Sequence, residues 1–368
     1  MDVAAWTDAG LYDPAAPNAD ERLQLLSFLA EQGCSLGEMV AADDCGRLFA
    51  LAGDRLVRPG RDEFDLEQVA EQIGFPVEQV RAMWRALGLV DVGDAVASPD
   101  DVEMVRTALT VAGVLGMDAA LGTARVMGSA MARVGDAMSA AVRGRLPALS
   151  VVSSGSELAT ATAFAAIAET VPAIGRSLDT LFRHHLEAAR MHFERTDSWD
   201  VVGEGGIRLA VGFADMCGFT GLTQQLRMEE LSLLLTRFEE IASDVVTDHG
   251  GRLVKFIGDA VMFVTTDVVS AVAVADDLIA SAEERGLQAR AGVTVGTVLA
   301  LDGDYFGPMV NLASRLVGLA QPGDVLVSEP VADLLGDRRQ LSMLGPQQIR
   351  GFAEPVPVAR LERLLLPG

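Results

Sequence analysis

Two aspartates occupy positions from which a protein can hold divalent cations. Asp215 lies in the segment FADMCGFT at residues 213–220, and Asp259 lies in KFIGDA at residues 255–260. Each follows an apolar run that is typical of a strand, so both carboxylates are predicted at one edge of a sheet. Two ions about 3.5–4 Å apart can activate an oxygen nucleophile and neutralise a leaving phosphate. Magnesium and manganese prefer such oxygen ligands. Taken alone, an aspartate at a strand end is equally typical of a structural turn.

A lysine and a later segment supply polar groups that suit a nucleotide. Lys255 precedes the second aspartate by four residues, and the segment DYFGPMVNLASR at 304–315 contains Asp304, Asn311 and Arg315. Asn311 and Arg315 are four residues apart on a predicted helix and therefore share one face. Arginine suits phosphate, and asparagine can fix a ribose or ring oxygen. Separately, these residues also fit a surface lysine, a turn former and a solvated polar stripe. Their joint occurrence in this order favours a nucleotide site.

Alternating strands and helices must position these residues. The predicted strands are 207–214, 252–257, 260–265, 287–296, 297–300 and 324–328, and the predicted helices are 228–248, 268–285 and 310–320. The β-α-β-β-α-β order predicts an open ferredoxin-like sheet with helices on one face. In that plan the first strand lies beside the hairpin, so Asp215 and Asp259 come together although they are distant in sequence.

The preceding half of the chain is predicted to be all helical. Residues 20 to about 195 are rich in Ala, Leu and Met, with apolar side chains at helical spacing. Pro172 is predicted to break or kink the last long helix. The fold class is therefore α+β, an all-α domain followed by a ferredoxin-like βαββαβ domain. The predicted boundaries are a helical domain at 1–180, a linker helix and glycine-rich break at 181–204, and a second domain at 205–368.

Composition limits the location and the partners of the chain. Half of the 368 residues are apolar and the net charge is -23, which opposes nucleic acid and anionic membranes as partners. Three cysteines without paired spacing fit the reducing cytoplasm. The acidic N-terminus does not resemble a signal peptide. The longest apolar stretch, residues 151–174, is interrupted by Glu157 and Glu169. It predicts a packed helix rather than a transmembrane segment.

Residues 205–362 resemble the catalytic domain of class III adenylyl cyclases, which carries motifs like FxDxxGFT and Gly-Asp. The resemblance implies that ATP is converted to cyclic AMP and pyrophosphate with two Mg²⁺ or Mn²⁺ per active site. It also implies a homodimer, because each site takes the aspartates from one chain and the other groups from its partner. The implied roles are metal binding by Asp215 and Asp259, adenine recognition by Lys255 and Asp304, and transition-state stabilisation by Asn311 and Arg315.

The adenine pair distinguishes ATP from GTP by its donors and acceptors. Adenine offers N1 as an acceptor and its amino group as a donor, which Lys255 and Asp304 complement, whereas guanine reverses both groups.

Two other functions compete with adenylyl cyclase activity. A degenerate cyclase domain would act only as a relay, but all six positions are filled. A diguanylate cyclase shares the fold plan, but its Gly-Gly-Asp/Glu-Glu-Phe signature does not occur in the sequence.

The helical half contains a segment that resembles a winged helix-turn-helix of the MerR type, at residues 66–89. DNA binding is an alternative there, but only Arg81 and Arg85 would face a groove, against many acidic residues. The charge therefore favours structural reuse of the hairpin.

The helical half as a whole resembles the regulatory domain of soluble actinobacterial adenylyl cyclases, which implies inhibition of the catalytic pair and a response to acid or fatty acids. Three histidines, His184, His185 and His192, cluster before the catalytic domain. They either form an exposed polar face or change charge together between about pH 5 and 8. The Ala- and Met-rich helices either hold a fatty acid or form a dimer core.

Overall fold

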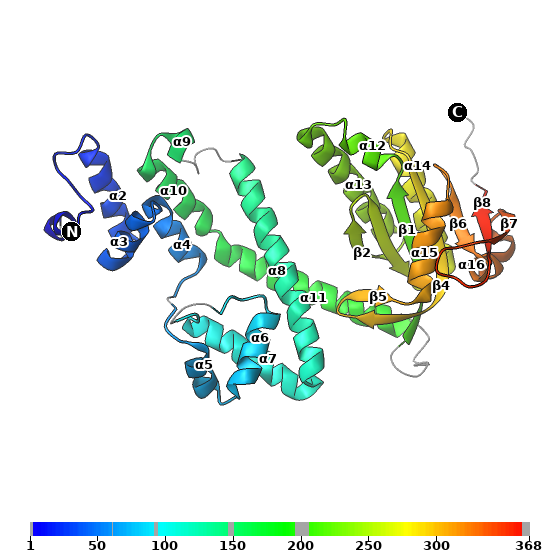
Figure 1. Ribbon diagram of the computed structural model, residues 1–368, viewed down its shortest axis with the longest axis horizontal. Helices are drawn as coiled ribbons and strands as arrows, with labels where there is room; N and C mark the ends of the chain where they lie inside the picture. Colours follow the sequence, from blue (N-terminus) through cyan, green and yellow to red (C-terminus); the bar gives the residue numbers. More distant parts are fainter. Residues whose placement is uncertain (1–2, 61, 92–94, 146–150, 196–205, 363–368) are drawn as a thin grey trace. The chain divides into compact units, whose positions relative to one another are not determined.

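A computed structural model describes residues 3–60, 62–91, 95–145, 151–195 and 206–362 (Figure 1). The chain divides into two compact units, Met1–His185 and Leu186–Gly368. The described part of the first unit is built of helices, and the second unit contains a mixed sheet with helices. The predicted α+β class is thus confirmed.

The helices before the sheet follow one another with short connections. They are α1 (Val3–Asp8), α2 (Ala19–Glu31), α3 (Leu36–Asp44), η1 (Leu48–Ala50), α4 (Leu51–Val57), α5 (Leu66–Ile73), α6 (Val77–Ala86), α7 (Pro99–Leu115), α8 (Met117–Arg145), α9 (Val151–Ser154), α10 (Glu157–Ala168) and α11 (Val171–Arg195). A first core lies between α2, α4 and α10, where Leu25, Leu29 and Ala165 are buried.

A second core joins α5, α6, α7 and the start of α8 around Trp84. The predicted helix-turn-helix is present, with Gly74 in the left-handed conformation between α5 and α6. Farther along α8, a Cβ on Gly128 would lie only 2.3 Å from the Leu87 carbonyl oxygen. The approach of α8 to the end of α6 therefore requires glycine at this position.

The long apolar run that ends in α11 is interrupted between two helices. The run Glu157–Met191 is long and apolar enough to cross a membrane, judged by length and composition alone. Its first helix, α10, packs into the first core through Ala161 and Ala165. The stretch predicted as one packed helix, 151–174, is divided among α9, α10 and the start of α11. Its second helix, α11, carries a charged residue every three or four positions from Arg176 onward. Pro172 lies in the first turn of α11, where proline is tolerated, and the helical break precedes it.

The second unit is an eight-stranded sheet in the order β2-β3-β1-β4-β6-β8-β7, with β5 paired to β4. Its strands are β1 (Gly206–Met216), β2 (Arg252–Ile257), β3 (Ala260–Thr265), β4 (Ala289–Leu301), β5 (Asp304–Phe306), β6 (Val325–Ser328), β7 (Leu341–Gln347) and β8 (Val356–Leu361). Its helices are α12 (Phe219–Thr223), α13 (Met228–Asp248), α14 (Val268–Glu284), α15 (Pro308–Leu319), α16 (Glu329–Leu335) and η3 (Gly336–Arg338). The two strands predicted at 287–296 and 297–300 are one continuous strand, β4.

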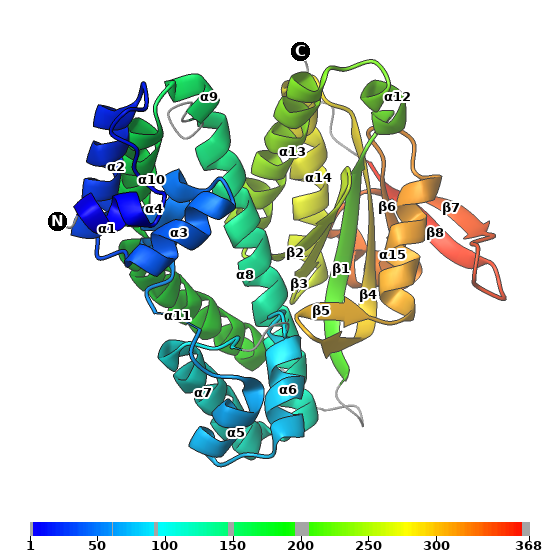
Figure 2. The same cartoon turned by 60° about the vertical axis from the view of Figure 1, so that its left-hand side comes forward.

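Helices cover both faces of this sheet, so the prediction of helices on one face is wrong. On one face, α13, α14 and α16 pack against Ala210 and Ala214 of β1. On the other face, α15 packs against Leu209, Val211 and Phe213 of the same strand. Figure 2 shows α13 and α14 on one side of the strands and α15 on the other. An amphipathic helix pattern indicates that a face is buried, but not which side of the sheet it covers.

A glycine sets the distance between α15 and the sheet. A Cβ on Gly292 of β4 would lie 2.7 Å from both the Ala313 carbonyl oxygen and the Leu316 Cβ. The helix therefore rests directly on the backbone of β4. This contact fixes the position of α15, which carries two of the six predicted site residues.

Candidate functional site

The fold brings Asp215 and Asp259 together at the end of β1. Asp215 pairs with Ala260 across the β1–β3 ladder, and the Met216 N–H donates to the Asp259 carbonyl oxygen at 3.1 Å. Strand alternation places Asp215 on the same face as Phe213, which packs against the α15 side of the sheet. The two carboxylates that the sequence singled out are therefore neighbours at the end of β1.

Burial and the neighbouring Asp215 carboxylate both disfavour the charged form of Asp259. Partial burial raises the pKa of the Asp259 carboxyl above its ordinary value, and the nearby Asp215 carboxylate raises it further. The backbone amide of Asp259 and the Arg290 guanidinium act in the opposite direction. A cation placed between the carboxylates would relieve the repulsion, which fits the oxygen-rich donor set that Mg²⁺ and Mn²⁺ prefer.

Arg290 on β4 is a site residue that was missed at the level of sequence. It lies directly opposite Asp215 in the β1–β4 register. Its Nη2 donates to the Asp215 Oδ2 at 3.0 Å and its Nε to the same oxygen at 3.3 Å, while its Nη1 donates to the Ala320 carbonyl oxygen at 3.2 Å. Arg290 is a lone arginine between Ala289 and Ala291 in an otherwise apolar predicted strand, and this pattern could have indicated a site residue.

Lys255 on β2 and Asp304 on β5 form an ion pair. The Lys255 Nζ donates to the Asp304 Oδ2, and the Asp304 Oδ1 accepts the Tyr305 N–H at 2.8 Å. Both oxygens of Asp304 are thus engaged, which fixes the orientation of its carboxylate. Tyr305 is buried, its hydroxyl accepts a bond from the Arg252 Nη1 at 3.4 Å, and burial raises the pKa of its phenol.

Asn311 and Arg315 lie on the exposed face of α15, as the spacing predicted. Leu312 and Leu316 on the opposite face are buried. Within the described parts of the chain, Arg315 makes no hydrogen bond or ion pair with Asp215 or Asp259. One chain therefore presents a carboxylate pair with Arg290, a Lys–Asp pair, and an exposed Asn–Arg pair as separate groups.

The carboxylate pair has few protein ligands to offer a cation. Over the described ranges, three or more His, Cys, Asp or Glu side chains do not gather at any point in a way that could hold a metal ion. Asp215 and Asp259 would therefore contribute only part of a coordination shell. The remaining oxygens must come from backbone, water or a bound substrate.

The histidine cluster lies near the end of α11. The side chains of His184 and His185 are exposed, and Asp179 and Arg183 form an ion pair at 2.9 Å one turn earlier. The side chain of His192 lies outside the described residues. The fourth histidine, His249, is in the second unit and contacts Asp277 at 2.7 Å.

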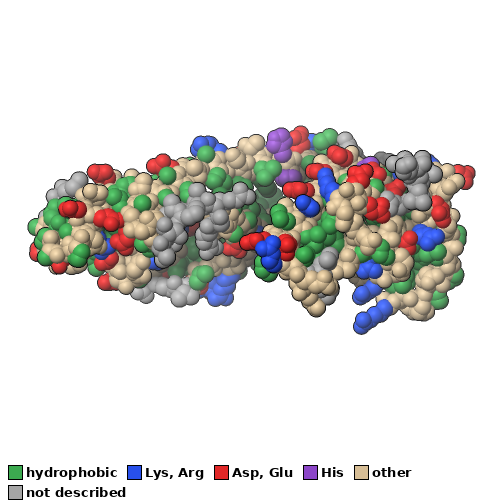
Figure 3. Space-filling model, turned by 90° about the horizontal axis from the view of Figure 1, so that it is seen from above, with side chains coloured by type: hydrophobic (Ala, Val, Ile, Leu, Met, Phe, Trp, Pro, Cys, Tyr) green, Lys and Arg blue, Asp and Glu red, His purple; other side chains and the backbone are tan. Residues whose placement is uncertain are grey.

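The arginines of the helix-turn-helix are paired with acids. Arg81 contacts Asp91 and, at 2.8 Å, Glu67, and Arg85 approaches Asp91 at 4.0 Å. Acidic side chains are spread over the described residues of the face seen in Figure 3. The cations of this segment are thus neutralised within the chain, which further disfavours DNA binding.

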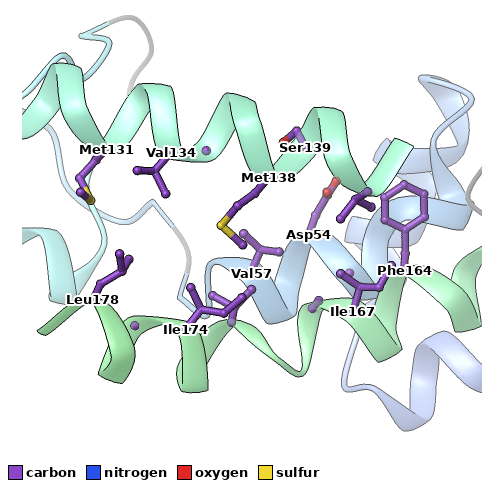
Figure 4. Close-up of a pocket in the computed structure, with 16 residues that line it drawn as sticks. Asp54, Val57, Met131, Val134, Met138, Ser139, Phe164, Ile167, Ile174 and Leu178 are labelled. Carbon is purple, nitrogen blue, oxygen red and sulfur yellow. The ribbon is translucent and has the colours of Figure 1, made fainter. Parts of the chain in front are cut away.

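An apolar cavity of about 630 Å³ lies within the first unit, between α4, α8, α10 and α11. In Figure 4, Met138 and Val134 of α8 face Ile174 and Leu178 of α11 across it, with Val57 of α4 between them. Asp54 and Ser139 are polar groups in the lining. A cavity of this kind suits a flexible apolar ligand, because methionine adapts its shape to its contents.

Comparisons with known proteins match each unit to a family model. Residues 9–189 match the adenylate cyclase regulatory domain. Residues 206–358 match the adenylate and guanylate cyclase catalytic domain.

Curated relatives match across most of the chain. An uncharacterized protein of Mycobacterium tuberculosis is 42% identical, over 97% of this chain and 93% of the relative. An adenylate cyclase of Streptomyces coelicolor is 34% identical, over 78% of this chain and 75% of the relative. A pH-sensitive adenylate cyclase of M. tuberculosis is 31% identical, over 93% of this chain and 88% of the relative.

Proposed function

Because the chain belongs to the class III adenylyl cyclase family of the actinobacterial type, with an N-terminal regulatory domain, we propose that it converts ATP to cyclic AMP and pyrophosphate in a homodimer. The observation that carries this proposal is the separation of the site residues. Asp215 and Asp259 lie together, while Arg315 is exposed on α15 and, among the described residues, makes no hydrogen bond or ion pair with them. An exposed arginine on a helix face is available to a second chain.

The residues of the chain divide the chemistry between them. Asp215 and Asp259 would hold two Mg²⁺ or Mn²⁺, which supply positive charge for the ribose 3′-hydroxyl and the phosphates. Lys255 donates to adenine N1, and Asp304 accepts from the adenine amino group. Asn311 orients the ribose, and Arg315 offsets the charge that grows on the α-phosphate. The hydroxyl loses its proton to solvent as its oxygen attacks the α-phosphorus, and pyrophosphate leaves with the electrons of the broken P–O bond.

A two-fold dimer completes both sites at once. Since each chain holds the aspartate set and the Lys-Asp-Asn-Arg set, an isologous pair forms two equivalent sites. The dimer geometry then controls activity, because a small shift between the chains separates the cations from the groups that hold ATP.

A product assay tests the proposal directly. The purified chain is incubated with ATP or GTP and manganese, with and without residues 1–196, and the cyclic nucleotide is identified by mass spectrometry. We expect cyclic AMP. If neither form produces it, the chain is a non-catalytic relay, and the proposal is wrong.

The helical domain is proposed to regulate the catalytic domain. The proposed boundaries are 1–180 for the regulatory domain, 181–204 for the linker and 205–368 for the catalytic domain. The protein is proposed to be cytoplasmic. Protonation of His184, His185 and His192 is proposed to shift the linker helix and so reorient the catalytic halves. The side chains of His184 and His185 are exposed.

Changing His184, His185 and His192 together to Gln is expected to flatten the pH dependence of activity between about pH 5.5 and 8, the range in which histidine titrates. Gln keeps hydrogen bonding and removes the charge change. The matched control is His249→Gln, which removes a histidine from the catalytic unit instead. A triple variant whose pH profile superimposes on that of the unmodified protein would eliminate these histidines as the sensor.

A fatty acid is proposed as a ligand of the apolar cavity, supported by its volume and by its largely apolar lining, which includes Met131 and Met138. Filling the cavity by Met138→Trp is expected to abolish binding of a fluorescent fatty acid, because the larger ring occupies the space of the chain. Met104→Trp, at an exposed position outside the lining, is the control. Equal binding by both variants would instead favour the dimer-core interpretation.

A further inference from the structure

Arg290 forms a partly buried ion pair with Asp215, one of the two proposed cation ligands. The guanidinium meets one carboxylate oxygen through two nitrogens, at 3.0 and 3.3 Å. Only 19% of the Asp215 side chain and 29% of the Arg290 side chain are exposed. An ion pair this sheltered from solvent is screened much less than one at the surface.

The backbone holds Arg290 in this position. The β1–β4 register sets it directly opposite Asp215, and its third nitrogen donates to the Ala320 carbonyl oxygen at the end of α15. The guanidinium therefore bridges two fixed acceptors. A guanidinium that donates to two fixed acceptors moves away from the carboxylate less readily than the guanidinium of a solvated arginine would.

A divalent cation at Asp215 has to compete with this bound positive charge. The Asp215 Oδ2 is occupied by the guanidinium, and Asp259 is the other carboxylate of the pair. With these two carboxylates as its side-chain ligands, a free cation would gain little from entering. ATP changes this balance, because its phosphates bring several oxygens to the cation and add negative charge beside the guanidinium.

We propose that Arg290 is a built-in counter-ion that keeps divalent cations from Asp215 until the nucleotide brings them. Arg290 is then a positioning residue that makes cation binding depend on ATP. In the absence of nucleotide it neutralises Asp215 and limits repulsion between the two aspartates. This inference rests on the proposed metal-binding role of Asp215 and Asp259.

Manganese binding without nucleotide tests the proposal. Free Mn²⁺ is measured by electron paramagnetic resonance during titration of the full-length protein. We expect weak binding by the unmodified chain and binding on the order of tenfold tighter by Arg290→Gln, the size of a typical coupling between two sites. Arg290→Lys is the matched control, since it keeps the positive charge and should remain weak. Asp215→Asn combined with Arg290→Gln should lose the tighter binding.

The direction of the change separates this role from a structural one, because damage to the fold would weaken metal binding rather than strengthen it. Arg290→Met replaces the Gln variant if that protein does not fold, since its apolar stem preserves the packing. A folded Gln or Met variant that binds Mn²⁺ no more tightly than the unmodified chain overturns the proposal. Failure of the unmodified protein to make cyclic AMP would instead refute the proposed function, and the Mn²⁺ titration remains interpretable in that case.

Discussion

Mixing an Asp215→Ala protein with an Arg315→Ala protein is expected to restore the ATP cyclisation that neither variant catalyses alone. Each substitution removes one half of every site in its own homodimer, so each should lose roughly 10²–10³-fold in turnover, the usual effect of deleting one group that stabilises transition-state charge. In a mixed dimer, one site combines both defects and the other contains neither.

Random exchange of chains sets the size of the recovery. Half of the dimers are mixed and half of their sites are intact, so about a quarter of the unmodified activity should return. The measurement is cyclic AMP formation as the ratio of the two proteins is varied at constant total concentration, with a maximum at equal amounts.

The matched control mixes Asp215→Ala with Asp259→Ala. These residues are neighbours at the end of β1 and belong to the same half of the site, so no combination of the two chains rebuilds an intact half. Recovery in this control would mean that the variants were not truly inactive. An absence of recovery in the first mixture, although the variants exchange chains, would show that each chain carries a complete site by itself.

Reversing the charges of the Lys255–Asp304 pair is expected to change the nucleotide preference. Lys255→Glu with Asp304→Lys places an acceptor where guanine has its N1–H and a donor where it has its carbonyl oxygen. When a site that is complementary to guanine binds adenine, its polar groups are left without hydrogen-bond partners. The ATP/GTP ratio of kcat/KM should therefore fall by roughly 10³-fold or more.

The reversed pair retains an opposite-charge contact between β2 and β5, so the local fold should tolerate it better than either single change. The single variant Lys255→Glu places two carboxylates together and is the control for simple disruption, which should reduce ATP and GTP turnover alike. If the double variant keeps the original ATP/GTP ratio, these residues do not read the base.

Local patterns in the sequence determined much of the second unit. The strands at 252–257 and 260–265 and the helix at 228–248 agree residue for residue with β2, β3 and α13. Strand alternation and the turn-forming Gly258-Asp259 pair act over a few residues, so the neighbouring sequence contains the necessary information. The same holds for Asn311 and Arg315, whose shared face follows from helical spacing.

Tertiary structure alone decided which side chains meet across the sheet. The sequence did not show that α15 covers the face opposite α13 and α14, that β4 is one strand, or that Arg290 lies on Asp215. Such contacts depend on strand order and register, and register is fixed by packing between segments far apart in the chain. The apolar cavity between four helices has the same origin. The residue types and their local spacing in the sequence identified the candidate site residues. Long-range packing decided which charged side chains lie opposite one another, because electrostatic interaction depends on distance through space rather than along the chain.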